Sequence, residues 1–218
     1  KVIKGNGKEE DVLACQLKVE CDLAVEIPSR EQEHTILTEG VERQVVVDPL
    51  VRKVYLELPP PSLEDNRDDW VRLAGKEGAM PDLKVIQDLP KKLRENNFEV
   101  TAVVGESRII GVESGDTGNK LLGMAFDIGT TTIAGYLVNL RTGEEIARVS
   151  SLNPQTKFGA DVISRITFAS DVPLGLDKLH REIINELNNL VEKAVSMTGF
   201  KAEDVYILTV VGNTTMHH

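Results

Sequence analysis

Aromatic residues, cysteines and long apolar runs are all scarce in this chain of 218 residues. Aromatics make up 4% and hydrophobic residues 41%, so any core must consist mainly of aliphatic side chains. No apolar run approaches the roughly 20 residues that a membrane-spanning helix needs. The first residues also lack the apolar centre of a signal peptide. We therefore expect a cytoplasmic protein without a membrane segment.

Basic residues are outnumbered, with 25 Lys and Arg against 35 Asp and Glu and a net charge of −10. An acidic surface repels the phosphate backbone, which argues against non-specific binding to nucleic acid. The two cysteines, Cys15 and Cys21, are too few for a disulfide scaffold. What remains is a globular protein whose chemistry must be sought in its motifs.

The first 120 residues predict strands and a small α+β unit. Short strands are expected at Val12–Cys15 and Asp22–Ile27, and 29–53 resembles a linker with an apolar centre at Gln44–Asp48. The unit over 54–120 begins with a strand at Val54–Leu58, which three prolines end. We expect Ser62 to cap a helix that uses Leu63, Trp70 and Leu73 as core contacts. A second helix within 82–96 and a hairpin over 100–112 complete it, and the glycines at 115–120 predict a turn.

The most informative stretch is Leu121–Val138, LLGMAFDIGTTTIAGYLV, in which two strand-like runs flank a polar tip. Gly129 can turn the backbone where a side chain would clash. The backbone N–H groups of the tip and the hydroxyls of Thr130, Thr131 and Thr132 suit the oxygens of a phosphate. Asp127, at the end of the first run, can hold Mg²⁺ directly or through water. The alternative is an ordinary hairpin with a threonine-rich turn.

The rest of the chain predicts a third strand, two helices and a buried strand. We expect the strand at Glu145–Ser151, a helix at Gly159–Ala169 with Val162, Ile163, Ile166 and Phe168 as its contacts, and a helix at Leu176–Val195 that Gly199 caps. Val205–Val211 is a continuous apolar run, typical of a central strand covered on both faces. Gly212, Asn213 and Thr214 follow it, where α/β sheets bind ligands. Asn213 and Thr214 either reach a ligand or cap the next helix.

Three motifs together resemble one family. DIGTTT looks like the first phosphate motif of the acetate kinase, sugar kinase, Hsp70 and actin superfamily. With NPQ-x-x-FGADVISRI and VVGNTTM at this spacing, the chain resembles the ATP-dependent reductive activators of corrinoid proteins. The resemblance implies an α/β fold, α+β overall, in which 121–218 is the first lobe of an actin/Hsp70-like (ribonuclease H-like) nucleotide-binding domain and 54–120 a middle domain.

The same resemblance extends to the N-terminus. VLACQ, followed by D-L-x-V-E-I-P, resembles the end of a β-grasp [2Fe–2S] ferredoxin domain, here over 1–28. The resemblance makes Cys15 the fourth cluster ligand and Cys21 a bystander. The first three cluster cysteines and a second lobe are missing, so we expect truncation at both ends. Cys15 as a small buried hydrophobe is the alternative.

The family implies an iron–sulfur ATPase that binds ATP and Mg²⁺ and transfers an electron to a corrinoid partner. A homodimer is compatible with this resemblance. Asp161 either orients a water for ATP hydrolysis or favours a helix N-terminus. A small-molecule kinase of the same superfamily and a non-hydrolysing ferredoxin-linked scaffold are the competing functions. For this chain alone we expect weak or absent ATP binding and a partly exposed face along Val205–Val211.

Overall fold

The computed structural model describes residues 2–4, 9–10, 23–25, 46–77 and 80–218. The chain divides into two compact units, residues 1–35 and 36–218. In the first unit an antiparallel sheet has the order β2-β1-β3; its strands are β1 (Val2–Lys4), β2 (Glu9–Glu10) and β3 (Leu23–Val25).

Strand β3 confirms the centre of the strand predicted at Asp22–Ile27. The predicted strand Val12–Cys15, both cysteines and residues 29–45 of the predicted linker lie outside the described residues. The three domain boundaries drawn from the sequence, after residues 28, 53 and 120, stay predictions.

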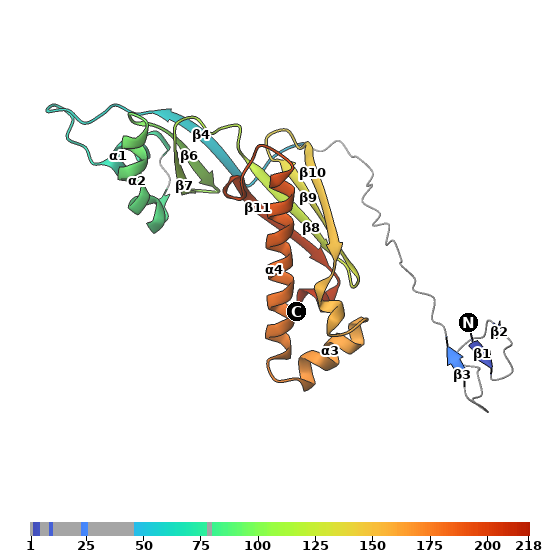
Figure 1. The fold of residues 1–218 in the computed structure, drawn as a ribbon. Helices are drawn as coiled ribbons and strands as arrows, with labels where there is room; N and C mark the ends of the chain where they lie inside the picture. Colours follow the sequence, from blue (N-terminus) through green and yellow to red (C-terminus); the bar gives the residue numbers. More distant parts are fainter. Residues whose placement is uncertain (1, 5–8, 11–22, 26–45, 78–79) are drawn as a thin grey trace. The chain divides into compact units, whose positions relative to one another are not determined.

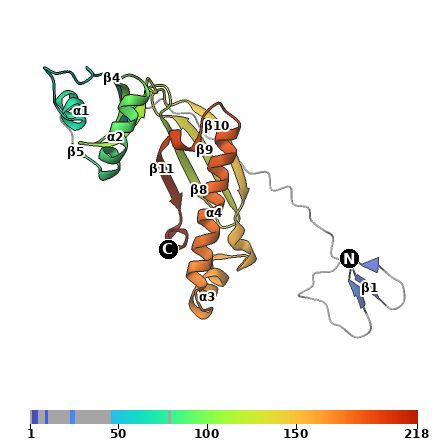
Figure 2. The same ribbon diagram turned by 60° about the vertical axis from the view of Figure 1, so that its left-hand side comes forward.

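The second unit contains two four-stranded mixed sheets (Figure 1). The first sheet has the order β4-β6-β7-β5, and its strands are β4 (Val51–Glu57), β5 (Met80–Pro81), β6 (Glu99–Gly105) and β7 (Arg108–Ser114). Helices α1 (Asp69–Glu77) and α2 (Leu83–Glu95) lie beside it, as Figure 2 shows from a second direction. The predicted strand, two helices and hairpin are thus confirmed, with β5 as an addition.

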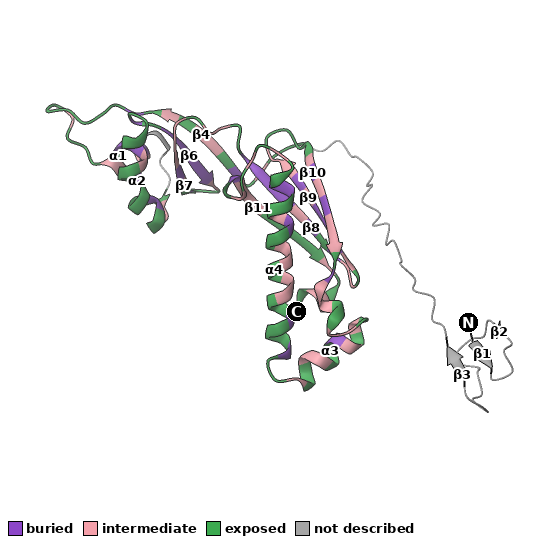
Figure 3. Cartoon of the chain, viewed as in Figure 1, coloured by how far each residue is buried: buried purple, intermediate pink, exposed green. Residues whose placement is uncertain are grey.

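Apolar side chains at helical spacing fix α2 against the first sheet. Leu89 and Leu93 are almost fully buried, and they belong to one core cluster with Val100 and Ile109 of the hairpin. Burying a leucine side chain contributes about 1.5–3 kcal/mol. This cluster, visible as purple segments in Figure 3, gives the first sheet its own core.

Two expectations about the region before α1 are wrong. Ser62 does not cap a helix: its hydroxyl accepts hydrogen bonds from the backbone N–H groups of Glu64 and Asp65 in a separate turn. The helix begins at Asp69, after Asp68, whose carboxylate accepts the N–H of Val71 at 2.8 Å. Leu63 is 99% exposed rather than a core contact.

The cause lies in Arg72, whose side chain is fully buried on α1. Its guanidinium donates to the carbonyl oxygens of Pro59, Asp65 and Arg67 at 2.9, 2.7 and 3.1 Å, and to the Asp65 carboxylate at 2.7 Å. These bonds hold the preceding segment as an irregular loop, because its carbonyls point at Arg72 instead of along a helix axis.

The second sheet has the order β10-β9-β8-β11, with antiparallel pairs except for the parallel pair β8–β11. Its strands are β8 (Leu122–Ile128), β9 (Thr132–Asn139), β10 (Glu145–Leu152) and β11 (Val205–Gly212). Between β10 and β11 lie the 3₁₀ helix η2 (Pro154–Lys157), α3 (Val162–Asp171), α4 (Gly175–Ser196) and the 3₁₀ helix η3 (Ala202–Asp204); α5 (Thr214–His217) follows β11. The three-strand meander predicted from DIGTTT onward is confirmed.

Helix α4 covers one face of the second sheet. Leu190 and Ala194 are buried with Met124, Phe126 and Ile128, which alternate along β8 and so share one face. The C-cap of α4 is Met197 rather than Gly199. In α3, the expected core contacts Ile163 and Ile166 are 71% and 46% exposed, because α3 packs through Phe168 on Phe158, with ring centroids 4.7 Å apart.

Strand β11 does not have the predicted central place. Among the described residues it pairs with β8 alone and forms the edge of the second sheet. Leu208 is 60% and Val211 53% exposed, which confirms the expected partly exposed face along this strand. Both sheets are mixed and accompanied by helices, which confirms an α+β class. No helix in the described ranges is long and apolar enough to cross a membrane.

We predict that Arg72→Met lowers the free energy of unfolding by about 3 kcal/mol, because it leaves buried carbonyl oxygens unpaired. Urea titration followed by Trp70 fluorescence measures this, since Trp70 is the only tryptophan and packs on the core of the first sheet. The matched control is Arg67→Met, which removes a half-exposed partner of the same Asp65 carboxylate and should change little. Equal effects of the two substitutions would contradict the anchoring role of Arg72.

Candidate functional site

The tip of the β8–β9 hairpin is a tight turn that requires glycine. The N–H of Gly129 donates to the carbonyl oxygen of Thr132 at 2.9 Å. A Cβ atom at residue 129 would lie 2.8 Å from that same oxygen, which is closer than real Cβ contacts allow. Gly129, Thr130 and Thr131 therefore form the loop, with Thr131 exposed, and Thr132 begins β9 beside them.

Asp127 lies on β8 beside this tip. Its neighbours Phe126 and Ile128 are buried against the α4 side, so alternation places the Asp127 carboxylate on the opposite face, where it is exposed. An exposed carboxylate at the end of a strand can hold Mg²⁺ together with phosphate oxygens and water. The predicted position of this residue relative to the threonines is thus realised.

Asn153 directly follows β10, is fully buried and forms hydrogen bonds to the tip. Its side-chain nitrogen donates to the carbonyl oxygen of Gly129 at 2.8 Å, and its backbone N–H donates to that of Thr131 at 2.8 Å. Its side-chain oxygen accepts the N–H of Gln155 and so caps η2. One residue therefore satisfies two carbonyls of the tip, through its side-chain amide and its backbone N–H, and caps the next helix.

Arg165 on α3 completes the support and is 1% exposed. Its guanidinium donates to the carbonyl oxygen of Thr130, to that of Gly159 at 2.9 Å and to the side-chain oxygen of Gln155 at 3.4 Å. Burial lowers the pKa of Arg165, and the negative charge of Asp161 opposes that shift. A buried cation thus holds the carbonyl oxygen of Thr130 at the tip.

Asp161 is the N-cap of α3. Its carboxylate accepts the N–H of Ser164 at 2.9 Å, while the Ser164 hydroxyl accepts the N–H of Asp161, which completes a capping box. The backbone hydrogen bond from Ser164 is the main cause that lowers the pKa of this carboxyl. Of the two roles weighed for Asp161, this geometry supplies helix capping; orientation of a water stays a prediction.

The turn after β11 reaches the same edge of the sheet. Because β11 runs parallel to β8, Val211 lies beside Asp127 and Gly212 beside Ile128. A Cβ atom at Gly212 would lie 3.3 Å from the carbonyl oxygen of Ile128, so the two strand ends approach closely. Asn213 caps α5 by accepting the N–H of Met216 at 3.1 Å.

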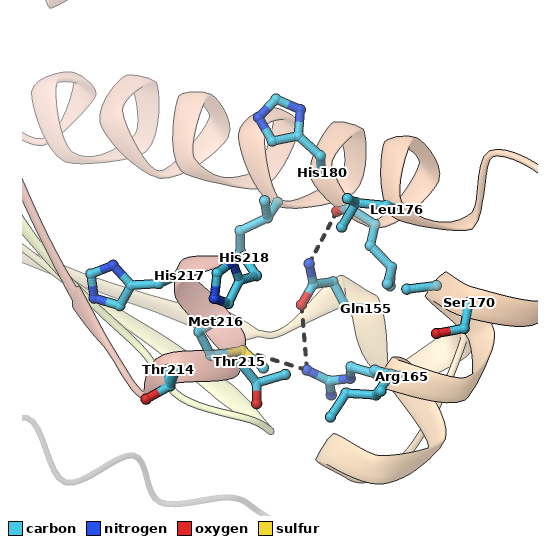
Figure 4. Close-up of a pocket in the computed structure, with 14 residues that line it drawn as sticks. Gln155, Arg165, Ser170, Leu176, His180, Thr214, Thr215, Met216, His217 and His218 are labelled. Atoms are coloured by element: carbon cyan, nitrogen blue, oxygen red, sulfur yellow. Dashed lines mark hydrogen bonds between the residues drawn. The ribbon is translucent and has the colours of Figure 1, made fainter.

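A cleft of about 420 Å³ lies between α3, α4 and α5 (Figure 4). Its lining includes Arg165, Gln155, His180 and Thr214, but neither Asp127 nor Thr130–Thr132. The Arg165 guanidinium lies 3.9 Å from the sulfur of Met216 at the cleft wall and also bonds the tip. Arg165 therefore contacts both the cleft and the hairpin tip, and Asp127 and Thr130–Thr132 are not among the lining residues of the cleft.

The structure therefore brings Asp127, the tip threonines and Gly212–Thr214 to one edge of the second sheet. Asp161 connects to this edge only through the charge it places near Arg165, and Cys15 lies outside the described residues. Sequence reasoning missed Asn153 and Arg165 as site residues. A buried role for Arg165 had one available signal, a single cation within the apolar stretch VISRI.

The described residues contain no group of three or more His, Cys, Asp or Glu that could hold a metal ion. Magnesium in phosphate sites needs only one or two carboxylates, since phosphate oxygens and water supply its other ligands. Asp127 meets that requirement. A glycine–threonine tip beside the end of a parallel strand pair is an arrangement that suits phosphate, and phosphate binding at this tip stays a prediction.

Comparison with known families matches most of the chain. Residues 122–218 match the model for the RACo middle region, and residues 40–119 match the model for the RACo linker region. The chain belongs to the RACo family of reductive activators, with its first sheet in the linker region and its second sheet in the middle region. This confirms the family resemblance predicted from the sequence motifs.

Two relatives give the extent of the match. The corrinoid activation enzyme RamQ of Eubacterium limosum is 29% identical over 221 residues, which cover 99% of this chain and 37% of RamQ. A solved structure named reductive activator for corrinoid, iron-sulfur protein is 34% identical, with a TM-score of 0.68 over 82% of this chain and 30% of that one. The chain thus spans about a third of the length of these relatives.

We predict that Arg165→Met speeds amide hydrogen exchange at Gly129 by at least about tenfold, or about 1.4 kcal/mol of local opening. The reason is that the carbonyl of Thr130 loses its buried donor. Arg181→Met, an exposed arginine on α4, is the matched control and should leave the tip unchanged. Unaltered exchange at Gly129 in Arg165→Met would show that the tip holds its shape without this side chain.

Proposed function

We propose that the full-length protein is an iron–sulfur ATPase that uses ATP binding and hydrolysis to drive the reductive activation of a corrinoid protein. The observation that carries this proposal is the meeting of Asp127, the braced threonine tip and the Gly212–Thr214 turn at one edge of the second sheet. Both relatives are named for corrinoid activation, which supplies the partner class.

In this proposal the second sheet and its helices form the first lobe of an actin/Hsp70-like nucleotide-binding domain. The N–H groups and hydroxyls of Thr130, Thr131 and Thr132 bind phosphate oxygens, and Asp127 binds Mg²⁺ directly or through water. Gly212 permits the ends of β8 and β11 to approach each other closely, and Asn213 and Thr214 border the same site. Magnesium, when bound, neutralises charge on the phosphates.

The remaining residues of the site position these groups. Asn153 and Arg165 hold the carbonyl oxygens of the tip inward, so its N–H groups and hydroxyls remain available to a ligand. Preorganised donors of this kind need no rearrangement when charge develops on a phosphoryl group. Asp161 is exposed and remains the proposed water-orienting carboxylate, in addition to its helix-capping contact.

A [2Fe–2S] cluster requires four ligands, typically cysteine thiolates, whereas this chain contains two cysteines. The residues present therefore do not fit a whole cluster, and Cys15 is proposed only as one of its ligands. The proposed contribution of the chain described here is conformational: the nucleotide state changes how the protein docks on its corrinoid partner. Cytoplasmic location and a homodimer remain part of the same proposal.

A small-molecule kinase is the alternative, since a braced phosphate tip serves either reaction. The match of residues 40–119 to the RACo linker region favours the activator. A non-hydrolysing scaffold is the third possibility. ATP turnover by the full-length protein that a corrinoid protein stimulates would exclude the scaffold, while phosphorylation of a small molecule would establish the kinase.

We predict that Asp127→Asn in the full-length protein abolishes Mg-ATP hydrolysis and leaves the fold intact, because an exposed carboxylate contributes no core packing. A steady-state phosphate-release assay measures turnover, and circular dichroism checks the fold. Asp171→Asn, an exposed acid at the end of α3, is the control and should retain activity. Wild-type turnover in Asp127→Asn would show that the Asp127 carboxylate is only part of the hairpin and has no part in hydrolysis.

We predict that Cys15→Ser in the full-length protein bleaches or shifts a [2Fe–2S] absorption spectrum, whereas Cys21→Ser leaves it unchanged. A serine hydroxyl replaces a thiolate ligand poorly, so iron content per chain should fall with the spectrum. Normal iron content and spectrum after loss of Cys15 would refute its assignment as a cluster ligand.

A further inference from the structure

A half-buried carboxylate lies where the two sheets of the second unit meet. Glu113 on β7 accepts a hydrogen bond from Lys53 Nζ on β4 at 2.6 Å and one from the hydroxyl of Thr117. It also accepts the hydroxyl of Tyr206, the second residue of β11. Glu113 and Lys53 belong to the first sheet and Tyr206 to the second, so this cluster joins the two.

The charges in the cluster are shielded from water. The Lys53 side chain is 1% exposed and that of Glu113 is 23% exposed, and the ammonium lies 4.8 Å from the centre of the Tyr206 ring. Burial alone would raise the pKa of Glu113, but hydrogen bonds from Lys53, Thr117 and Tyr206 together lower it. A lysine this deeply buried is costly unless it is paired, so the contact resists separation.

Apolar residues from both sheets enclose the same place. Val51 and Val103 of the first sheet form a buried cluster with Leu121, and Leu140, Tyr206 and Ile207 pack against it. A hydrogen bond holds Thr117 in position to contact Glu113, since the N–H of Thr117 donates to the Thr101 hydroxyl at 3.0 Å. Parting the sheets here would therefore expose an ion pair and an apolar cluster at once.

The strand that carries Tyr206 leads directly to the candidate phosphate site. The register of β11 against β8 shifts between Val205 and Ile207, and such a bulge re-aims the side chain at its centre. From Ile207 the pairing is continuous to Gly212, about 20 Å from Tyr206 at about 3.3 Å per residue. Tyr206 and the Gly212–Thr214 turn thus lie at opposite ends of β11.

Strand β11 has few other contacts that hold it in place among the described residues. It pairs with β8 alone, and Leu208 and Val210 are 60% and 44% exposed. Apart from the ladder to β8, its beginning is held by the Glu113 cluster and the packing of Val205 and Ile207, and its end by the contacts of Met216. A change at one end is therefore expected to shift the other.

We propose that the Lys53–Glu113–Tyr206 cluster is a coupling joint through which the linker region positions β11, and with it the Gly212–Thr214 turn beside Asp127 and the tip. Glu113 and Tyr206 are positioning residues that do not touch a ligand. The inference rests on the proposed nucleotide site for its functional meaning. By linkage, a ligand that fixes the turn also strengthens the joint, and a partner that strains the joint weakens the ligand.

The test compares Tyr206→Phe with Tyr55→Phe. Both remove a tyrosine hydroxyl close to a glutamate. Glu99, which contributes to the raised pKa of Tyr55, lies in the first sheet with Tyr55, whereas the hydroxyl of Tyr206 donates from the second sheet to Glu113 in the first. Hydrogen exchange of the 218-residue chain should rise about tenfold over residues 207–216 in Tyr206→Phe and stay at the wild-type rate in Tyr55→Phe. Wild-type rates over 207–216 in Tyr206→Phe would overturn the joint.

A second measurement uses the full-length protein and Mg-ATP. Tyr206→Phe should weaken binding about five- to tenfold in isothermal titration, with Tyr55→Phe equal to wild type. Faster exchange over 207–216 with unchanged affinity would overturn the coupling. If the wild-type protein binds no nucleotide, the proposed function fails, and the exchange experiment alone then decides whether the first sheet positions β11.

Discussion

The candidate site depends on one set of contacts, the donation from Asn153 and Arg165 to the carbonyl oxygens of Gly129, Thr130 and Thr131. A three-residue loop rich in threonine has many conformations, and fixing it costs about 1–2 kcal/mol of backbone entropy per residue. The buried amide and guanidinium offset that cost, because each would lose a hydrogen-bond partner without the loop. They also occupy the carbonyl oxygens of Gly129, Thr130 and Thr131 with buried donors.

This arrangement explains why the motifs are spread along the chain. The NPQ turn delivers Asn153, the following helix delivers Arg165, and the parallel pairing of β8 and β11 delivers Gly212. Each motif supplies one wall of the same place, so none of them identifies the site alone. The family match to the linker and middle regions agrees with this order of elements.

Glu113 plays the corresponding part between the two sheets. It collects donors from β4, from the turn after β7 and from β11, and it is enclosed by apolar residues of both sheets. Buried charged groups have strict geometric demands, since a buried charge that loses its partner strongly destabilises the fold. Such a cluster fixes relative position better than an apolar contact of the same size, which tolerates sliding.

The sequence by itself determined the elements whose signals are local. The hairpin around Asp127, the helix over Leu176–Val195 and the hairpin over 100–112 follow from periodicity and turn residues, and DIGTTT marked the tip. Only the tertiary structure decided that Arg72 holds the chain before α1 out of a helix, that β11 is an edge strand, and that Arg165 and Tyr206 meet partners 35 and 93 residues away. The physical reason is that a buried polar side chain is defined by the partner that satisfies it, and periodicity carries no information about a partner so distant in the chain.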